Sequence, residues 1–151
     1  MKKILFTLLL IAGISIFYSA SAQDYKSALG IRLSSNAPVV NNSITFKYFL
    51  NQKAALEGLL TIGDPVAIGI LYEIHNPINQ PGLKWFYGGG GYVGFSGASN
   101  LGAMGIIGLD YKFTNIPLNL SLDWKPELNI VSDINFEPAA IGFSARFTFG
   151  K

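Results

Sequence analysis

Two residues that lie close together in this chain have the side chains of an acid–base catalyst. His75 is the one histidine in the sequence, and Glu73 lies two positions before it. A histidine can act as a general base with the help of such a carboxylate or of a nearby serine. The segment that follows, 76–82, is composed mainly of proline, asparagine and glycine, which is typical of a turn. We therefore interpret His75 as a turn residue and assign no catalytic residue.

Other kinds of chemical site find little support in the sequence. Cysteine is absent, which excludes disulfides, thiolate nucleophiles and zinc–thiolate sites, and no second histidine is available for a metal. The glycine-rich segment 89–94 matches a dinucleotide-binding pattern, but it lies inside a strand pattern and no helix follows it. We expect no cofactor and assign no cofactor-binding or metal-binding residue.

Acidic residues could be read as catalytic pairs at two places. These are Glu57 with Glu73, and Asp123 with Glu127. Lysines and arginines occupy equivalent positions in the alternating pattern described below. Opposite charges arranged in this way form an ordinary ion network more often than a catalytic pair. We therefore expect these carboxylates to make ion pairs inside the fold.

The N-terminus has the three parts of a secretory signal peptide. Lys2 and Lys3 precede an apolar run over residues 4–16, and small residues follow at 19–22. The run is shorter than the ~20 residues that a membrane-spanning helix needs, and the small residues mark a cleavage site. We predict a signal peptide at residues 1–22 and a single domain at residues 23–151. Loss of the two lysines makes cationic and acidic residues equal in number, so the basic precursor implies no nucleic-acid partner.

The rest of the chain alternates between apolar residues and small, polar or charged residues, with a turn-forming cluster after each run. Leu29, Ile31 and Leu33, for example, alternate with Gly30 and Arg32. This period of two indicates β-strands. The pattern occurs eight times and predicts an all-β fold, an eight-stranded antiparallel up-and-down barrel, whose closure leaves no unpaired edge. The expected strands contain residues 29–33, 44–48, 56–62, 66–74, 83–95, 103–113, 118–124 and 141–149.

One set of strand positions is apolar and the other carries the charges, so the barrel must point one set inward. The charged set is rich in glycine and serine, which suits a crowded lumen. Aromatic residues gather near strand ends, and the last strand ends in Phe147-Thr148-Phe149, as in membrane barrels. We therefore predict a transmembrane barrel whose apolar set faces lipid. The charged positions expected in the lumen are Arg32, Lys47, Glu57, Glu73, Lys84, Asp110, Lys112, Asp123, Lys125 and Arg146.

Four of these lumen residues are expected to form one network. Arg146, Lys125, Asp123 and Asp110 lie on the last three predicted strands, which are neighbours in the barrel. An isolated buried charge is costly, so opposite charges in a narrow lumen should pair. The lumen of an eight-stranded barrel is filled by side chains, so we expect no porin.

An even number of strands places both ends of the domain on one side of the membrane, which for a secreted chain is the periplasm. The turns expected on this side are 51–53, 75–82 and 114–116. The loops expected on the outer side are 35–42, 63–65, 96–100 and 129–138. These outer loops are short compared with those of receptors and adhesins.

Several segments together resemble a known family, the small outer-membrane β-barrel domain proteins that are frequent in Bacteroidetes. The resemblance rests on the segments Phe46-Lys47-Tyr48-Phe49, Ala55-Leu56-Glu57-Gly58, Leu71-Tyr72-Glu73, 85–90, 105–113, 116–126 and 145–149, of which 116–126 is the most specific. It covers nearly all of residues 23–151. The resemblance implies the barrel fold and an outer-membrane location. It implies no catalytic residues, because the family as a whole has no assigned activity.

The sequence thus leads to one functional hypothesis with two alternatives. The first is a non-enzymatic, monomeric barrel of the cell outer membrane with a structural or interaction role in the envelope. Its partners would be membrane lipid, lipopolysaccharide and the barrel insertion machinery. The second is a lipid A-modifying enzyme, of the deacylase or acyltransferase type, that uses His75 and Glu73. The third is a soluble, lipocalin-like carrier, in which the apolar set would line the lumen.

Overall fold

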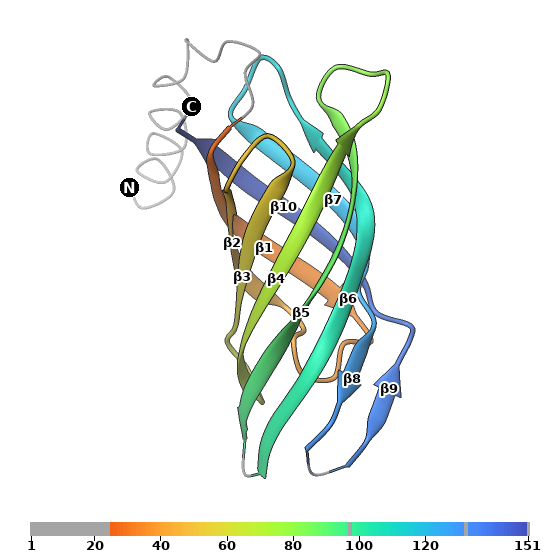
Figure 1. Cartoon of the computed structure of the whole chain (residues 1–151). Coiled ribbons are helices and arrows are strands. Elements are labelled where there is room, and N and C mark those ends of the chain that lie inside the picture. The colour runs from red at the N-terminus through yellow and green to blue at the C-terminus, as the bar shows by residue number, and fades with distance from the viewer. Residues whose placement is uncertain (1–24, 97, 132, 151) are drawn as a thin grey trace, which may run out of the picture.

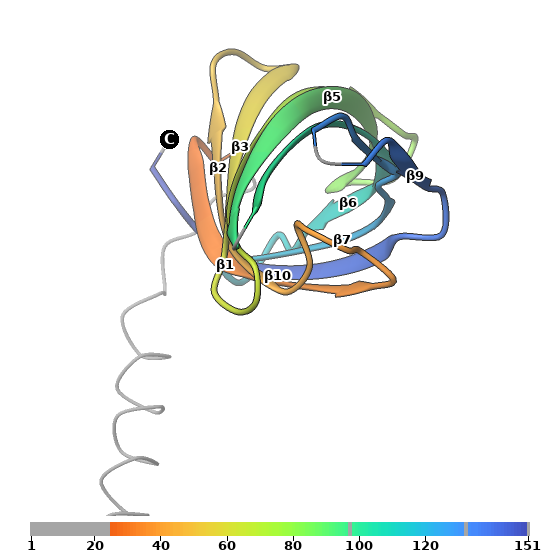
Figure 2. The ribbon, with the colours of Figure 1, turned by 90° about the horizontal axis from the view of Figure 1, so that it is seen from below.

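The chain forms a closed antiparallel β-barrel in the computed structural model, which describes residues 25–96, 98–131 and 133–150 (Figures 1 and 2). The strands are β1 (Ser27–Ser35), β2 (Ser43–Phe49), β3 (Ala54–Thr61), β4 (Val66–Pro77), β5 (Leu83–Ser96), β6 (Ala98–Lys112), β7 (Leu118–Trp124), β8 (Glu127–Asn129), β9 (Asn135–Glu137) and β10 (Ile141–Phe149). The prediction of an all-β, eight-stranded antiparallel barrel is confirmed. The predicted signal peptide at residues 1–22 lies outside the described residues.

Closure of the barrel depends on pairing between the first and last strands. Ser27 pairs with Phe149 and Ser35 pairs with Ile141, so β1 and β10 run side by side along their full lengths. Every other strand pairs with an antiparallel neighbour, from β1 through β2 to β7 and back to β10. Seen from below, the strands form a ring (Figure 2). Across the described residues, no helix is long and apolar enough to cross a membrane.

The seventh strand position of the barrel, which we call its seventh wall, is filled by two segments, β7 and β8. Ile107 pairs with Trp124 and Met104 pairs with Glu127, so β8 continues β7 along β6 in the same register. Pro126 lies between them and has no N–H to donate, which interrupts the regular ladder. β9 then pairs with β8 and leads into β10. The additional segments therefore lengthen existing walls of the eight-stranded barrel.

Three of the predicted loops are shorter than expected. β4 extends to Pro77, so the turn expected at 75–82 begins later. β5 extends to Ser96 and β6 begins at Ala98, so residues 96 and 98–100 of the expected loop 96–100 belong to strands. The expected loop 129–138 contains the end of β8 and the whole of β9. In each case cross-strand pairing continues through residues whose local preference is for turns, because the neighbouring strand supplies partners.

The two ends of the barrel can be told apart by the chain termini. We call the end with Ser27 and Phe149 the terminal end, and the end with Ser35 and Ile141 the far end. The β2–β3, β4–β5 and β6–β7 connections lie at the terminal end, and the β1–β2, β3–β4, β5–β6 and β8–β9 connections lie at the far end (Figure 1). This is the alternation that the sequence predicts.

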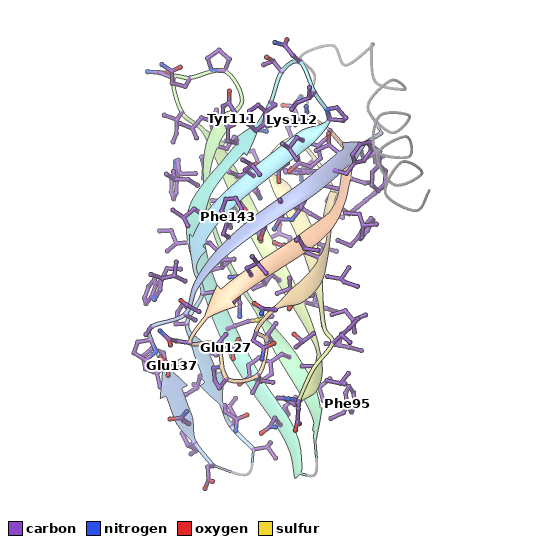
Figure 3. All side chains as sticks on the ribbon, turned by 180° about the vertical axis from the view of Figure 1, so that it is seen from behind. Phe95, Tyr111, Lys112, Glu127, Glu137 and Phe143 are labelled. Atoms are coloured by element: carbon purple, nitrogen blue, oxygen red, sulfur yellow. The ribbon has the colours of Figure 1, made fainter. Side chains whose placement is uncertain are left out.

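The outer surface of the barrel is apolar and its interior contains the charges. In β2, for example, residues alternate strictly between buried and exposed from Ser43 to Phe49. Large apolar side chains on the exposed positions cover every wall. They include Leu29, Ile31, Ile44, Phe46, Leu60, Ile68, Ile70, Tyr87, Phe95, Ile107, Leu109, Leu122, Phe143 and Phe147. Phe95 and Phe143 are labelled in Figure 3.

Candidate functional site

The charged residues predicted to face the lumen do lie inside the barrel. Eight of the ten, all but Lys84 and Lys112, are almost completely inaccessible to solvent. Lys84 and Lys112 lie near the terminal end of their strands and are partly exposed. Glu127, which the sequence placed in a possible carboxylate pair, is also buried in the lumen. The lumen is therefore the candidate functional site of this protein.

A central cluster joins charges from five walls of the barrel. Lys47 Nζ lies 2.8 Å from Glu73 Oε2, 3.4 Å from Glu57 Oε2 and 3.8 Å from Asp110 Oδ2. Arg146 on β10 pairs with Glu57 on β3. Two cationic side chains thus pair with three carboxylates. Each carboxylate has at least one cation beside it, because a buried charge without a partner of opposite sign is costly.

Neutral groups complete the coordination of the Arg146 guanidinium. Arg146 Nη1 donates to Asn119 Oδ1 at 3.1 Å and to Ser121 Oγ at 2.9 Å, and Nε donates to Thr45 Oγ1 at 3.1 Å. Asn119 Nδ2 in turn donates to Asp110 Oδ1 at 2.8 Å. These hydrogen bonds hold the arginine in one geometry, because the guanidinium has fixed donor directions.

Two further ion pairs lie in the far half of the lumen. Arg32 on β1 pairs with Asp123 on β7, and Lys125 Nζ lies 2.5 Å from Glu127 Oε1. The sequence suggested that Arg146, Lys125, Asp123 and Asp110 would form one network among themselves, and only part of that grouping is right. Arg146 and Asp110 belong to the central cluster and are joined through Asn119. Asp123 and Lys125 instead form separate ion pairs, with Arg32 on β1 and with Glu127 on β8.

The interpretation of His75 as a turn residue is also wrong. His75 belongs to β4, pairs with Phe86 on β5, and has a fully buried side chain. Its Nε2 lies 2.8 Å from Glu73 Oε2, and its ring stacks on Phe86 with the centroids 4.9 Å apart. The proline at position 77 ends β4, and Gly82, at φ 82°, supplies the positive φ of the turn that follows. The turn-forming residues therefore begin after His75.

Aromatic rings close the lumen at the terminal end. Tyr25 packs edge-on against Phe49 with the ring centroids 5.2 Å apart, and Phe49 lies 5.0 Å from the His75 ring. Outside this layer is a depression of about 450 Å³, lined in part by Tyr25, Phe49 and Asp110. The aromatic layer covers the ion cluster from the terminal mouth except at Asp110, which borders the depression.

The β1–β2 loop closes the lumen at the far end, a feature that the alternating pattern did not reveal. Val39 and Val40 of this loop are buried in one apolar cluster with Leu59, Leu71 and Met104. Glu127 and Lys125 bind the backbone of the same loop. A possible signal in the sequence is the pair of consecutive valines inside a segment otherwise composed of turn-forming residues.

The glycine-rich segment 89–94 lies within β5, as the strand pattern indicated. Glycines elsewhere in the lumen make room for larger neighbours. A Cβ at Gly142 would collide with the Arg32 guanidinium, and one at Gly102 would collide with the Tyr92 ring. A Cβ at Gly69 would lie 2.7 Å from Met104 Cε. These glycines allow long side chains to cross a narrow lumen.

The residue of the lumen most suited to acid–base chemistry is His75. Nδ1 of His75 has no hydrogen-bond partner among the described residues, so the ring could accept a proton there. The ring is, however, covered by Phe49 and Phe86 and reaches no open surface. Within the described ranges, no group of three or more histidine, cysteine, aspartate or glutamate residues has a geometry that could hold a metal ion. The charges are satisfied mainly by one another.

Comparisons with known proteins do not assign the chain to a family: no family model matches it, and no curated protein matches it.

Proposed function

We propose that this protein is a small integral β-barrel of the bacterial outer membrane, without enzymatic activity, that has a structural or interaction role in the cell envelope. The observation that carries the proposal is the distribution of polarity across the barrel wall. Apolar side chains cover the outside, and ion pairs fill the inside. Contiguous exposed apolar surface on this scale is rare on water-soluble monomers, whereas a lipid-facing surface requires it.

The aromatic residues support the same placement. Tyr48, Trp85, Tyr87 and Tyr111 are exposed and lie near the terminal end of their strands, and Trp124 is exposed at the end of β7 nearer the far end. Figure 3 shows Tyr111 near one end of the barrel and Phe95 near the other. Tyrosine and tryptophan are enriched where a membrane meets water, because they have an apolar body and a polar group.

A soluble carrier agrees less well with this structure. A lipocalin-like protein would turn its apolar set toward the lumen, and here that set faces outward. The lumen is filled by ion pairs in its centre and by the chain's own β1–β2 loop at the far end. The family resemblance noted in the sequence implies the same location and likewise brings no activity.

Cell fractionation tests the membrane placement directly. We expect the mature protein in the outer-membrane fraction, retained after washing with high salt and released by detergent. The reason is that the exposed apolar surface has no other favourable environment. Recovery of the protein in the soluble periplasmic fraction without detergent would contradict the proposal.

Mass spectrometry of lipid A tests the absence of lipid-modifying activity. Cells with the gene, cells without it and cells with His75→Ala should have the same pattern of acyl chains, because His75 is enclosed between Phe49 and Phe86. The level of folded protein is measured in each strain as a control. An acyl chain that is lost or gained with the gene, and that His75→Ala restores, would support the lipid A-modifying enzyme instead.

A further inference from the structure

The far half of the lumen forms an apolar chamber that a piece of the chain itself occupies. Leu59, Leu71, Tyr92 and Met104 are buried there from four different positions of the wall. The occupant is the β1–β2 loop, which we define as residues 36–42 and which contributes Val39 and Val40 to the same cluster. The loop is not part of any β-strand.

The loop's backbone is held by one buried ion pair. Glu127 Oε2 accepts a hydrogen bond from Val39 N at 3.3 Å, and Glu127 Oε1 accepts one from Val40 N at 3.2 Å. Lys125 Nζ donates to Val40 O at 3.2 Å. The ion pair thus supplies acceptors for two consecutive N–H groups and a donor for one carbonyl. Glu127 is labelled inside the barrel wall in Figure 3.

This set of contacts recognises peptide backbone together with two small aliphatic side chains. The polar contacts go to main-chain N–H and C=O groups, which any peptide carries. The specific part is the pair of apolar side chains that enters the chamber. Recognition of peptides commonly divides in this way, with main-chain hydrogen bonds giving affinity and side-chain pockets giving specificity.

The wall around the loop has room because glycines face it. A Cβ built on Gly94 would lie 3.0 Å from Val39 Cγ1, and one built on Gly69 would lie 3.6 Å from Val40 Cγ2. A depression of about 490 Å³ at the far end is lined by Pro38 and Val39 of the loop and by residues of the β5–β6 and β8–β9 hairpins. The loop is therefore the floor of an open depression.

We propose that the far half of the lumen is a binding site for a bent peptide segment with two consecutive small aliphatic residues, and that residues 36–42 are its intramolecular occupant. Release of the loop leaves Glu127 and Lys125 with the donors and acceptors that an incoming peptide can satisfy. The proposal deepens the interaction role proposed above and rests on it only in assigning the far end to the cell exterior. The binding assay itself uses protein in detergent micelles, so a failure of the membrane placement appears in fractionation and not here.

The test compares a locked and an unlocked loop in the same protein. The spacing of 3.0 Å between the Gly94 Cβ position and Val39 Cγ1 matches the distance of about 3 Å from one sulfur to the opposite Cβ in a disulfide. The chain has no cysteine of its own, so V39C/G94C can be oxidised cleanly. The probe is a fluorescein-labelled peptide Ala-Pro-Val-Val-Asn, which copies residues 37–41, and the readout is fluorescence anisotropy. We expect the reduced protein to bind, the oxidised protein not to bind, and dithiothreitol to restore binding.

A second variant opens the site instead of locking it. Val40→Asp should expel the loop from the apolar chamber and tighten peptide binding by about tenfold or more, because the competing occupant is removed. In that variant, Glu127→Gln should weaken binding by about tenfold through loss of the charged acceptor. The matched change Glu137→Gln, at a carboxylate on β9 that accepts a hydrogen bond from Ala139 N and not from the loop, should leave binding unchanged.

Three results would overturn the proposal. They are equal peptide binding by oxidised and reduced V39C/G94C, no binding by the Val40→Asp variant, and equal binding of the control peptide Ala-Pro-Asp-Asp-Asn. The first would place the peptide elsewhere on the protein. The second would show that the loop is a fixed part of the fold, and the third would show that binding does not depend on the two aliphatic side chains.

Discussion

Asp123→Ala is expected to lower the free energy of unfolding by about 3 to 5 kcal/mol. Asp123 and Arg32 form an ion pair in which each side chain is 1% exposed. Without the carboxylate, the hydrogen bond to Ser34 Oγ is the contact that remains to the Arg32 guanidinium among the described residues. The loss is large because the guanidinium then stays in the lumen with its charge uncompensated. Urea unfolding in lipid vesicles, followed by tryptophan fluorescence, measures the effect.

A double replacement separates the energetic cost of an unpaired Arg32 from the net contribution of the ion pair to stability. Arg32→Met together with Asp123→Leu removes both charges and keeps apolar volume, and we expect it to recover most of the lost stability, because buried ion pairs are often no better than well-packed apolar residues. If Asp123→Ala cost less than about 1 kcal/mol, Arg32 would be hydrated and the lumen would be wetter than the burial of its side chains indicates.

Ile70→Arg is expected to destabilise the protein in lipid by about 2 to 4 kcal/mol. Ile70 lies in the middle of β4 and its side chain is 58% exposed on the outer surface. If this surface faces lipid, the arginine is placed near the middle of the apolar layer, where a charge is most costly. Urea unfolding in vesicles, compared with wild type under the same conditions, gives the difference.

Ile134→Arg is the matched control for this experiment. Ile134 is more exposed, at 83%, but it lies in the β8–β9 connection at the far end and outside the strands. We expect its replacement to cost about 0 to 1 kcal/mol, as near a membrane interface. Similar small effects at both positions would mean that Ile70 faces water, because surface substitutions in water change stability by only about 0.5 kcal/mol. That result would favour a soluble barrel.

The fold and the two faces of the wall could be predicted from the sequence because both depend on a local period. Side chains of a strand alternate between two sides, so the parity of Lys47, Glu57 or Ile70 follows from its near neighbours. One set of alternating strand positions is apolar and carries no charge, and the other set carries nearly all the charges. This division leaves few alternatives to a closed barrel. The ends at which the chain turns also follow, since each strand reverses direction.

The partners within the lumen depended on the tertiary structure. Arg146 meets Glu57, and Arg32 meets Asp123, because closure pairs β1 with β10 and so brings the first strands close to the last ones around one narrow space. Alternation places a residue in the lumen, but it carries no information on height or on the facing wall. The same limit explains the wrong grouping of Arg146 with Asp123.

Tertiary contacts also determined the positions of residues that lie outside the regular alternating pattern. His75 continues β4 because Phe86 on β5 pairs with it, although the segment after it favours a turn. The β1–β2 loop has no period at all, and its place in the lumen results from the apolar chamber and from the Lys125–Glu127 pair. Local sequence therefore determined the wall of this barrel and its two faces. The contents of the lumen were decided only when the wall closed, because only then did side chains far apart in the chain come within contact distance.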